Sequence, residues 1–455
     1  MHQSKEDLLQ QYKGCDVSSL PKPAAIMDVA IARRHCSTML QAVQALNVNF
    51  RAHVKTHKTS ELALLQIGSD MHDVHLAVST VAEIEHLLPT LCNLKESGRA
   101  INILYSVPLP PSQTSRVAQL ARRLGPGSIT LLIDHPSHLK PLLVFRQEAG
   151  FPSGVFLKVD TGYHRAGLPP SSLNKGGLID EIARLESEGD VYFVGLYSHS
   201  SLSYAGTTAS EAMDALGSEI NGCLDALNYN QASLPKHHSI MISVGASPQV
   251  VAIQNFAGRN AGMSGPTITL ERALEDISNF EIGGCQITLE LHAGVYSVMD
   301  MQQFSTRSIN SLGHVDGEVA LSVAAEVVSV YNDGERQKPE ALLAVGTLGL
   351  GREPCASYKG WAVVGRSQKC HKANGDSRMI VERISQEHCV ISWDLADWPK
   401  EAQLPRLPLE VGQTLRLYPN HACVTGAMYG HYFVVDSDIL EPDIVQDVWV
   451  RASGW

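Results

Sequence analysis

Eight short stretches rich in apolar and β-branched residues alternate with longer amphipathic segments between residues 49 and 291, and this alternation constrains the fold most. The stretches that we predict to be strands are 49–54, 73–78, 101–106, 129–134, 155–160, 191–197, 239–244 and 286–291. Most are apolar throughout, as strands of a parallel sheet covered on both faces are. The segments with the apolar spacing of helices are 31–46, 112–124, 137–149 and 208–227. Eight such units predict an α/β protein with a (β/α)8 TIM-type barrel.

The sequence pattern changes after residue 296, because helical periodicity largely stops there. Its β-rich stretches are 318–331, 341–346, 379–384, 388–393, 414–418 and 432–436. They predict a C-terminal antiparallel β domain. We expect the barrel at 23–300, the β domain at 301–455 and an N-terminal segment, 1–22, that packs on the β domain. Two polar stretches that contain glycine, 257–278 and 352–378, are expected to be surface insertions.

Composition narrows the class of partner. The 455 residues carry a net charge of −11, which argues against a nucleic-acid surface or a basic membrane-binding face. We find no signal peptide and no apolar stretch long enough to span a membrane. The nine cysteines show no repeated spacing and read as reduced thiols. These features predict a cytoplasmic protein that acts on a small molecule.

Candidate functional residues follow the predicted strands, where barrels of this kind place their sites. The first strand runs into Lys55, the seventh into Gly245-Ala-Ser247 and the eighth into His292-Ala-Gly294-Val295. A partly desolvated lysine can form a Schiff base, and glycine lets backbone N–H groups approach a phosphate. A lysine together with a phosphate site is what pyridoxal phosphate needs. A solvated lysine at the barrel rim is the alternative interpretation.

A second candidate is the pair His421 and Cys423. In a strand-like stretch, 417–424, residues two positions apart project from one face, so both could bind one metal ion. Other histidines in these loops, namely His57, His164 and His199, could be ligands or structural residues.

Four segments resemble one family in chain order. Residues 51–59 resemble the cofactor-lysine segment of the fold-type III pyridoxal phosphate enzymes, in the branch of eukaryotic D-serine dehydratases and D-threonine aldolases. Residues 158–167 resemble the family's middle motif, 290–303 its eighth-strand segment and 418–423 the metal segment of the dehydratases. The resemblance covers nearly the whole chain.

The resemblance implies an alanine racemase-like barrel with a β domain, a homodimer, and pyridoxal 5'-phosphate bound to Lys55 as a Schiff base. The cofactor contacts that it implies are Arg165, Tyr197, Tyr204, Ser247, Gly294 and Val295. Two of these depart from the family pattern, since Ser247 stands where threonine is more usual and Val295 where asparagine is frequent. An ion pair with Asp160 is an alternative role for Arg165.

The metal segment separates the branches of this family. His-x-Cys looks like the zinc-dependent dehydratases, whereas the aldolases resemble His-x-Asp and use other divalent ions. Thiolate is a soft ligand that suits Zn²⁺. Two protein ligands, His421 and Cys423, would leave positions open for water and substrate, as a catalytic zinc requires.

The resemblance therefore implies a carbon–oxygen lyase that converts D-serine to pyruvate and ammonia. Lys55 would anchor the cofactor and remove the α-proton, and zinc would assist loss of the β-hydroxyl. Other substrates on the same scaffold remain open, through 3-hydroxyaspartate dehydratase or D-threonine aldolase activity. A non-catalytic pyridoxal phosphate carrier is the alternative from a different class.

Overall fold

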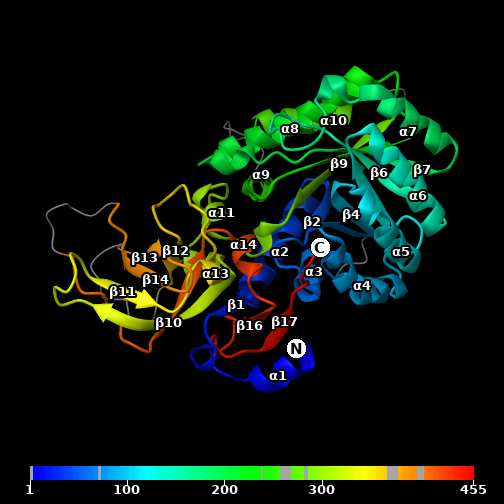
Figure 1. Ribbon diagram of the computed structural model, residues 1–455. Helices are drawn as coiled ribbons and strands as arrows, with labels where there is room; N and C mark the ends of the chain where they lie inside the picture. The colour runs from blue at the N-terminus through cyan, green and yellow to red at the C-terminus, as the bar shows by residue number, and fades with distance from the viewer. Residues whose placement is uncertain are drawn as a thin grey trace. The chain divides into compact units, whose positions relative to one another are not determined.

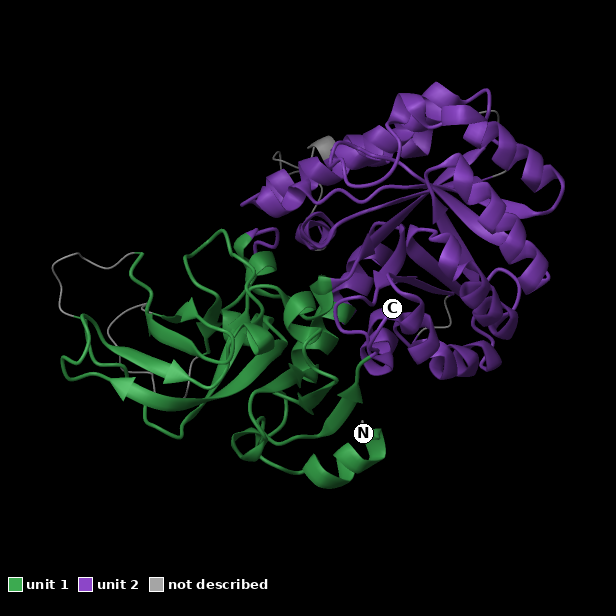
Figure 2. Ribbon diagram, in the orientation of Figure 1, with its two compact units in different colours: residues 1–36, 295–305, 311–451 green, residues 37–294, 306–310, 452–455 purple. Residues whose placement is uncertain are grey.

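The computed structural model describes residues 4–69, 73–236, 239–256, 268–280, 285–365, 378–396 and 404–455. The chain divides into two compact units (Figure 2). Unit 1 contains residues 1–36, 295–305 and 311–451, and unit 2 contains 37–294, 306–310 and 452–455. Both expected insertions, 257–278 and 352–378, lie partly outside the described residues.

Unit 2 is a closed parallel barrel of eight strands within its described residues (Figure 1). The strands are β2 (Asn49–His53), β3 (Val74–Val78), β4 (Ile101–Pro108), β5 (Ile129–Ile133), β6 (Ser153–Lys158), β7 (Val191–Tyr197), β8 (Ser239–Val244) and β9 (Gln286–Ala293). The last strand closes on the first, with Asn49 opposite Glu290. The predicted barrel is confirmed, and each expected strand overlaps an observed one.

Helices cover the outside of the barrel (Figure 1). They are α3 (Ser60–Ile67), α4 (Val81–Glu96), α5 (Thr114–Leu124), α6 (Leu139–Ala149), α7 (Leu178–Ser187), α8 (Ala209–Asn230), α9 (Ser247–Val251) and α10 (Ile268–Asn279). In α5, the buried residues Val117, Leu120, Ala121 and Leu124 form one apolar stripe. This stripe explains why the helical period could be read from the sequence.

Unit 1 contains one sheet of nine strands within its described residues, in the order β11-β14-β13-β12-β15-β10-β1-β16-β17. The strands are β1 (Ala24–Asp28), β10 (Leu321–Tyr331), β11 (Glu340–Leu343), β12 (Ala362–Val364), β13 (Met379–Ile384), β14 (Cys389–Trp393), β15 (Thr414–Pro419), β16 (His431–Val435) and β17 (Asp447–Val450). Its helices are α1 (Lys5–Tyr12), α11 (Met301–Ser305), α12 (Val315–Glu318), α13 (Thr347–Leu350) and α14 (Ala422–Gly426). Helix α2 (Val29–Ala45) begins in unit 1 and ends in unit 2.

The division of the chain differs from the expected one near residues 23 and 300. Residues 24–28 form β1, which pairs with β10 and β16 in the sheet of unit 1, and residue 295 already belongs to this unit. All five residues of β1 are buried. A short apolar strand of this kind carries no local signal of the sheet that it joins. Leu8, Val17 and Leu20 from the N-terminal segment pack with residues of β16 and β17.

Among the described residues, no helix has both the length and the apolar character needed to cross a membrane.

Candidate functional site

Lys55 lies two residues after β2 and is partly buried. Within the described part of the chain its Nζ has no hydrogen bond or ion pair. The neighbouring Lys58 differs, because its Nζ lies 3.0 Å from the buried carboxylate of Glu83. Lys55 is therefore the lysine of this segment whose amine is available for covalent chemistry.

The ring of His53 is neutral, and its hydrogen bonds fix which nitrogen carries the proton. Its Nδ1 accepts the backbone N–H of Lys55 at 3.3 Å, so its proton is on Nε2, 3.1 Å from Ser106 Oγ. The Ser106 hydroxyl in turn donates to the Val78 carbonyl at 2.8 Å. Burial, together with the positive charge of Lys55, holds the pKa of His53 well below its usual value. His53 orients the Lys55 backbone without adding a charge.

Three rings stack near the carboxyl ends of β7 and β9: Tyr197 at the end of β7, His199 in the loop that follows it, and His292 on β9. Tyr197 and His292 are parallel, with ring centres 4.4 Å apart, and the centre of His199 is 5.6 Å from that of His292. Burial lowers the pKa of His292 to about 3 and also places the pKa of His199 well below its usual value. Both imidazoles are therefore neutral at physiological pH. The Nζ of Lys158 lies 4.7 Å from the centre of the Tyr197 ring.

A buried ion pair fixes the tautomer of His292. Arg51 donates to both carboxylate oxygens of Glu290, at 2.8 and 3.1 Å. The Ser243 hydroxyl donates to Glu290 at 2.7 Å and therefore accepts from His292 Nδ1, which lies 3.1 Å away. This network could not be predicted from the sequence, because Arg51, Ser243 and the pair Glu290 and His292 lie on three strands that only barrel closure brings together.

The predicted phosphate loops come together at the ends of β8 and β9. Ser247 is the first residue of α9, and its hydroxyl accepts the backbone N–H of Gly294 at 3.3 Å. A Cβ at Gly294 would lie 3.0 Å from the His53 carbonyl oxygen, and one at Gly245 only 2.3 Å from that of His292. Gly245, whose φ of +148° is also unusual for other residues, therefore needs glycine, and Gly294 lies in tight contact with the strand that precedes Lys55. Val295 follows as a buried residue. A hydroxyl, closely approaching backbone and a free lysine fit the chemistry of pyridoxal phosphate.

Arg165 and Tyr204 lie in exposed loops. The Arg165 guanidinium is 5.1 Å from the centre of the Tyr163 ring. Asp160 accepts instead from the His164 ring at 2.8 Å, and among the described residues no ion pair joins Asp160 to Arg165. The structural role considered for Arg165 is therefore wrong.

The remaining candidate, His57, is part of the local structure of its loop. Its Nδ1 accepts the Thr59 N–H at 3.1 Å, and its Nε2 lies 3.0 Å from Gln66 Oε1. Both ring nitrogens are occupied, which leaves neither free for a ligand.

His421 and Cys423 come together, although not on a strand. Strand β15 ends at Pro419, His421 is the N-cap of α14, and Cys423 lies in the first turn of that helix. The predicted strand is therefore wrong beyond residue 419. The two side chains are close enough for Cys423 to act on the pKa of His421. Burial disfavours the charged form of His421, but the interactions with Cys423, Asp300 and Glu353 outweigh it and raise the pKa of His421 to about 9.

The buried residue Asp300 sets the start of α14. Its Oδ2 accepts the N–H of Ala422 and its Oδ1 that of Gln303, both at 2.8 Å. Asn420 is also fixed, since its amide donates to the carbonyl groups of Glu353 and Gly360 at 2.9 and 2.8 Å. His421 thus lies between Asn420 and Ala422, which are both held by hydrogen bonds.

The donor set fits an open metal site. In the described residues, no three His, Cys, Asp or Glu side chains are placed to hold one ion. His421 and Cys423 would supply one nitrogen and one sulfur, which leaves the other positions for water or substrate.

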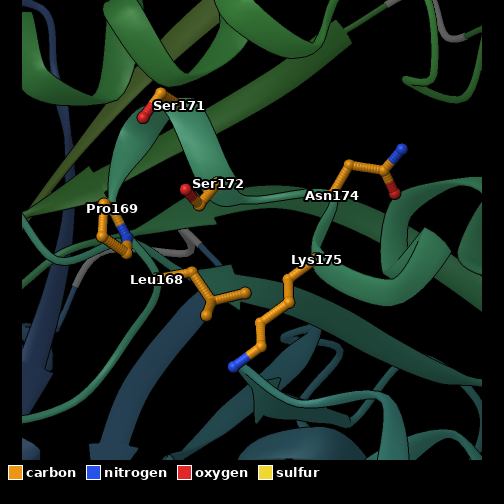
Figure 3. A pocket seen from close by; sticks show the side chains of 6 residues that line it. All are labelled: Leu168, Pro169, Ser171, Ser172, Asn174 and Lys175. Atoms are coloured by element: carbon orange, nitrogen blue, oxygen red, sulfur yellow. The ribbon is translucent and has the colours of Figure 1, made fainter.

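An open pocket of about 560 Å³ lies elsewhere on the barrel, in the loop after β6 (Figure 3). Its lining residues are Leu168, Pro169, Ser171, Ser172, Asn174 and Lys175. Asn174 is occupied, because its amide donates to Asp180 and Ser233 at 2.9 and 3.1 Å. None of the predicted site residues lines this pocket.

Comparison with known proteins shows the family of the chain. Residues 28–261 match the family model described as "Alanine racemase, N-terminal domain", and residues 320–435 match "Putative serine dehydratase domain". The D-serine dehydratase of Schizosaccharomyces pombe is 30% identical over 455 residues, which cover 99% of this chain and 96% of that protein. The chain belongs to the D-serine dehydratase family of fold-type III pyridoxal phosphate enzymes.

Other relatives of this family extend the comparison. The D-serine dehydratase of Saccharomyces cerevisiae is also 30% identical, over 99% of this chain and 100% of that protein. The structure of D-threo-3-hydroxyaspartate dehydratase from Delftia sp. has a TM-score of 0.70 at 25% identity and covers 97% of this chain and 100% of its own. The protein is therefore an enzyme, a lyase of the pyridoxal phosphate dehydratase type.

Proposed function

We propose that this enzyme converts D-serine to pyruvate and ammonia, with pyridoxal phosphate on Lys55 and zinc held by His421 and Cys423. The observation that carries the proposal is the unoccupied amine of Lys55, in a barrel that also brings Ser247 to the backbone of Gly294. Similarity to two D-serine dehydratases over nearly the full chain supports the choice of substrate.

Lys55 performs two tasks in this proposal. Pyridoxal phosphate, when bound, supplies an electron sink for the negative charge that develops at the α-carbon. Once substrate replaces it on the cofactor, the Lys55 amine accepts the α-proton. Because this amine stands on one face of the substrate, only one enantiomer presents its α-hydrogen to it.

His421 and Cys423 would hold the metal, which supplies Lewis acidity for departure of the β-hydroxyl group. Asp300 and Asn420 keep the two ligand residues at the start of α14, where their side chains meet. The thiolate favours zinc over harder ions. A solved structure of a D-threo-3-hydroxyaspartate dehydratase variant is of its metal-free form, which is consistent with a metal in enzymes of this fold.

A second candidate function is dehydration of 3-hydroxyaspartate, because the Delftia dehydratase is 27% identical over 96% of this chain. D-Threonine aldolase activity has less support. The aldolase of Filomicrobium marinum, at 19% identity, shares the fold, and this chain has Cys423 where the aldolases resemble His-x-Asp.

The test is incubation of the purified enzyme with D-serine, L-serine, D-threonine and D-threo-3-hydroxyaspartate, with and without a chelator. Keto acid, ammonia and glycine are measured. We expect pyruvate from D-serine, lost on metal removal and restored by zinc. Glycine from D-threonine would contradict the dehydratase proposal, and full activity after verified metal removal would contradict the role of His421 and Cys423.

A further inference from the structure

A buried carboxylate on helix α8 joins loops that carry the candidate cofactor residues. Glu219 is 2% exposed and lies in the middle of α8. Within the described part of the chain, the backbone N–H of Ser200 donates to one of its oxygens at 2.7 Å, and the Gln249 amide donates to the other. Both partners are donors that favour the ionised carboxylate, whereas burial raises the pKa of Glu219.

These donors belong to different strand-end loops. Ser198 and Ser200 flank His199 in the loop after β7, and Gln249 lies on α9 after β8, two residues from Ser247. The hydroxyls of Ser198 and Thr161 are 2.8 Å apart. One carboxylate thus joins the loops after β7 and β8, and the contact between Ser198 and Thr161 links the first of these to the loop after β6.

The packing of α8 confirms this close approach. A Cβ at Gly222, one turn after Glu219, would lie 2.8 Å from Thr161 Cγ2. Glycine at this position therefore allows the helix to contact the loop after β6. This contact fixes how closely α8, which carries Glu219, packs against that loop.

Lys158 supplies the counter-charge. Its side chain is 6% exposed, with its Nζ 4.7 Å from the centre of the Tyr197 ring, and it interacts electrostatically with Glu219. A buried carboxylate without a nearby cation would be costly. Lys158 therefore offsets part of the cost of burying the Glu219 carboxylate.

We infer that Glu219 is a positioning residue for the cofactor site, which it acts on by holding the loops of Thr161, Ser198–Ser200 and Gln249 in one arrangement. The inference rests on the proposed function only in taking pyridoxal phosphate as the ligand. Glu219 does not touch the reacting atoms, and its effect is to preorganise Tyr197, His199 and Ser247.

The experiment compares E219L, E219Q and a control, L224A, which removes buried apolar contacts from the same helix. Two quantities are measured beside Tm: amide hydrogen exchange of the ligand-free proteins and the Kd for pyridoxal phosphate. In E219L we expect faster exchange in the peptide spanning residues 198–206 and a Kd raised by about tenfold or more. E219Q retains an acceptor oxygen for the Ser200 N–H, so its Kd should rise less.

The control separates positioning from general destabilisation. L224A should lower Tm without raising the Kd or changing exchange at residues 198–206. If E219L binds pyridoxal phosphate as tightly as the wild type, or loses affinity no more than L224A at equal Tm, the inference is wrong while the proposed function stands. A wild-type protein that binds no pyridoxal phosphate would contradict both.

Discussion

At the scale of single residues, the fold separates side chains that look equivalent in the sequence. Lys55 and Lys58 occupy one short segment, yet Lys58 pairs with the buried Glu83 and Lys55 has no partner in the described part of the chain. The choice of Lys55 could be made from the sequence because its motif is local. The tautomer of His292 could not be predicted from the sequence. It depends on Ser243, which lies on another strand and also donates to Glu290.

The buried neutral histidines predict acid sensitivity. The pKa of His292 is about 3 in the folded protein, against an ordinary value near 6.5 in the unfolded chain. Between these values the unfolded state binds the extra proton, so stability is fully present above pH 6.5 and falls as the pH is lowered. By pH 5, His292 alone should cost about 2 kcal/mol of unfolding free energy. Urea denaturation of the ligand-free protein at pH 7, 6 and 5 measures this loss.

Two variants test whether His292 causes the loss of stability at low pH. His292→Gln should flatten the dependence by about one proton, and His388→Gln, at an exposed ring, is the control. An unchanged slope in His292→Gln would show that His292 is not the group responsible.

At the scale of elements, the starts and ends of helices and strands depend on distant partners. The sequence predicted a strand through residue 424, but the Asp300 carboxylate accepts the Ala422 N–H from 122 positions away and begins α14 there. Strand β1 was missed for a related reason, since its partners β10 and β16 are far along the chain. The barrel strands were predictable because each is a continuous apolar run next to its own helix.

The cap at α14 predicts a link between Asp300 and metal retention. Asp300→Ala removes two capping hydrogen bonds, which should cost about 2 kcal/mol of unfolding free energy. It should also lower the zinc retained after dialysis against a chelator, because the N-cap His421 loses its fixed position. Denaturation and metal analysis by mass spectrometry measure the two effects separately.

Asp16→Ala is the matched control, since Asp16 accepts the Ser18 N–H at 2.7 Å and caps a turn with no link to the metal segment. It should reduce stability while zinc content stays at the wild-type level. Equal zinc retention in Asp300→Ala would reduce Asp300 to a purely structural role.

At the scale of the whole molecule, the barrel and the β domain were predicted from the change in periodicity near residue 296, and the alanine racemase-like fold is confirmed. The exact division was not predictable, because residues 24–28 pair in the sheet of unit 1 and residues 306–310 belong to unit 2. Tertiary pairing, and not the local sequence pattern, decides which unit these segments join.

We also propose that the enzyme is a homodimer, as the family resemblance implies. Exposed apolar side chains such as Leu202 and Leu348, at 54% and 58%, are consistent with surfaces that a partner covers. Light scattering after size-exclusion chromatography should give about twice the chain mass of 49.4 kDa across a range of concentrations. A mass of one chain throughout would contradict the proposal.

The central claim is that Lys55 carries the cofactor, and covalent trapping tests it most directly. The protein is saturated with pyridoxal phosphate, reduced with borohydride, digested and mapped by mass spectrometry, together with the variants K55A and K58A. We predict one label, on Lys55, that is lost in K55A and kept in K58A. A label on Lys58 or Lys158, or label retained in K55A, would contradict the account.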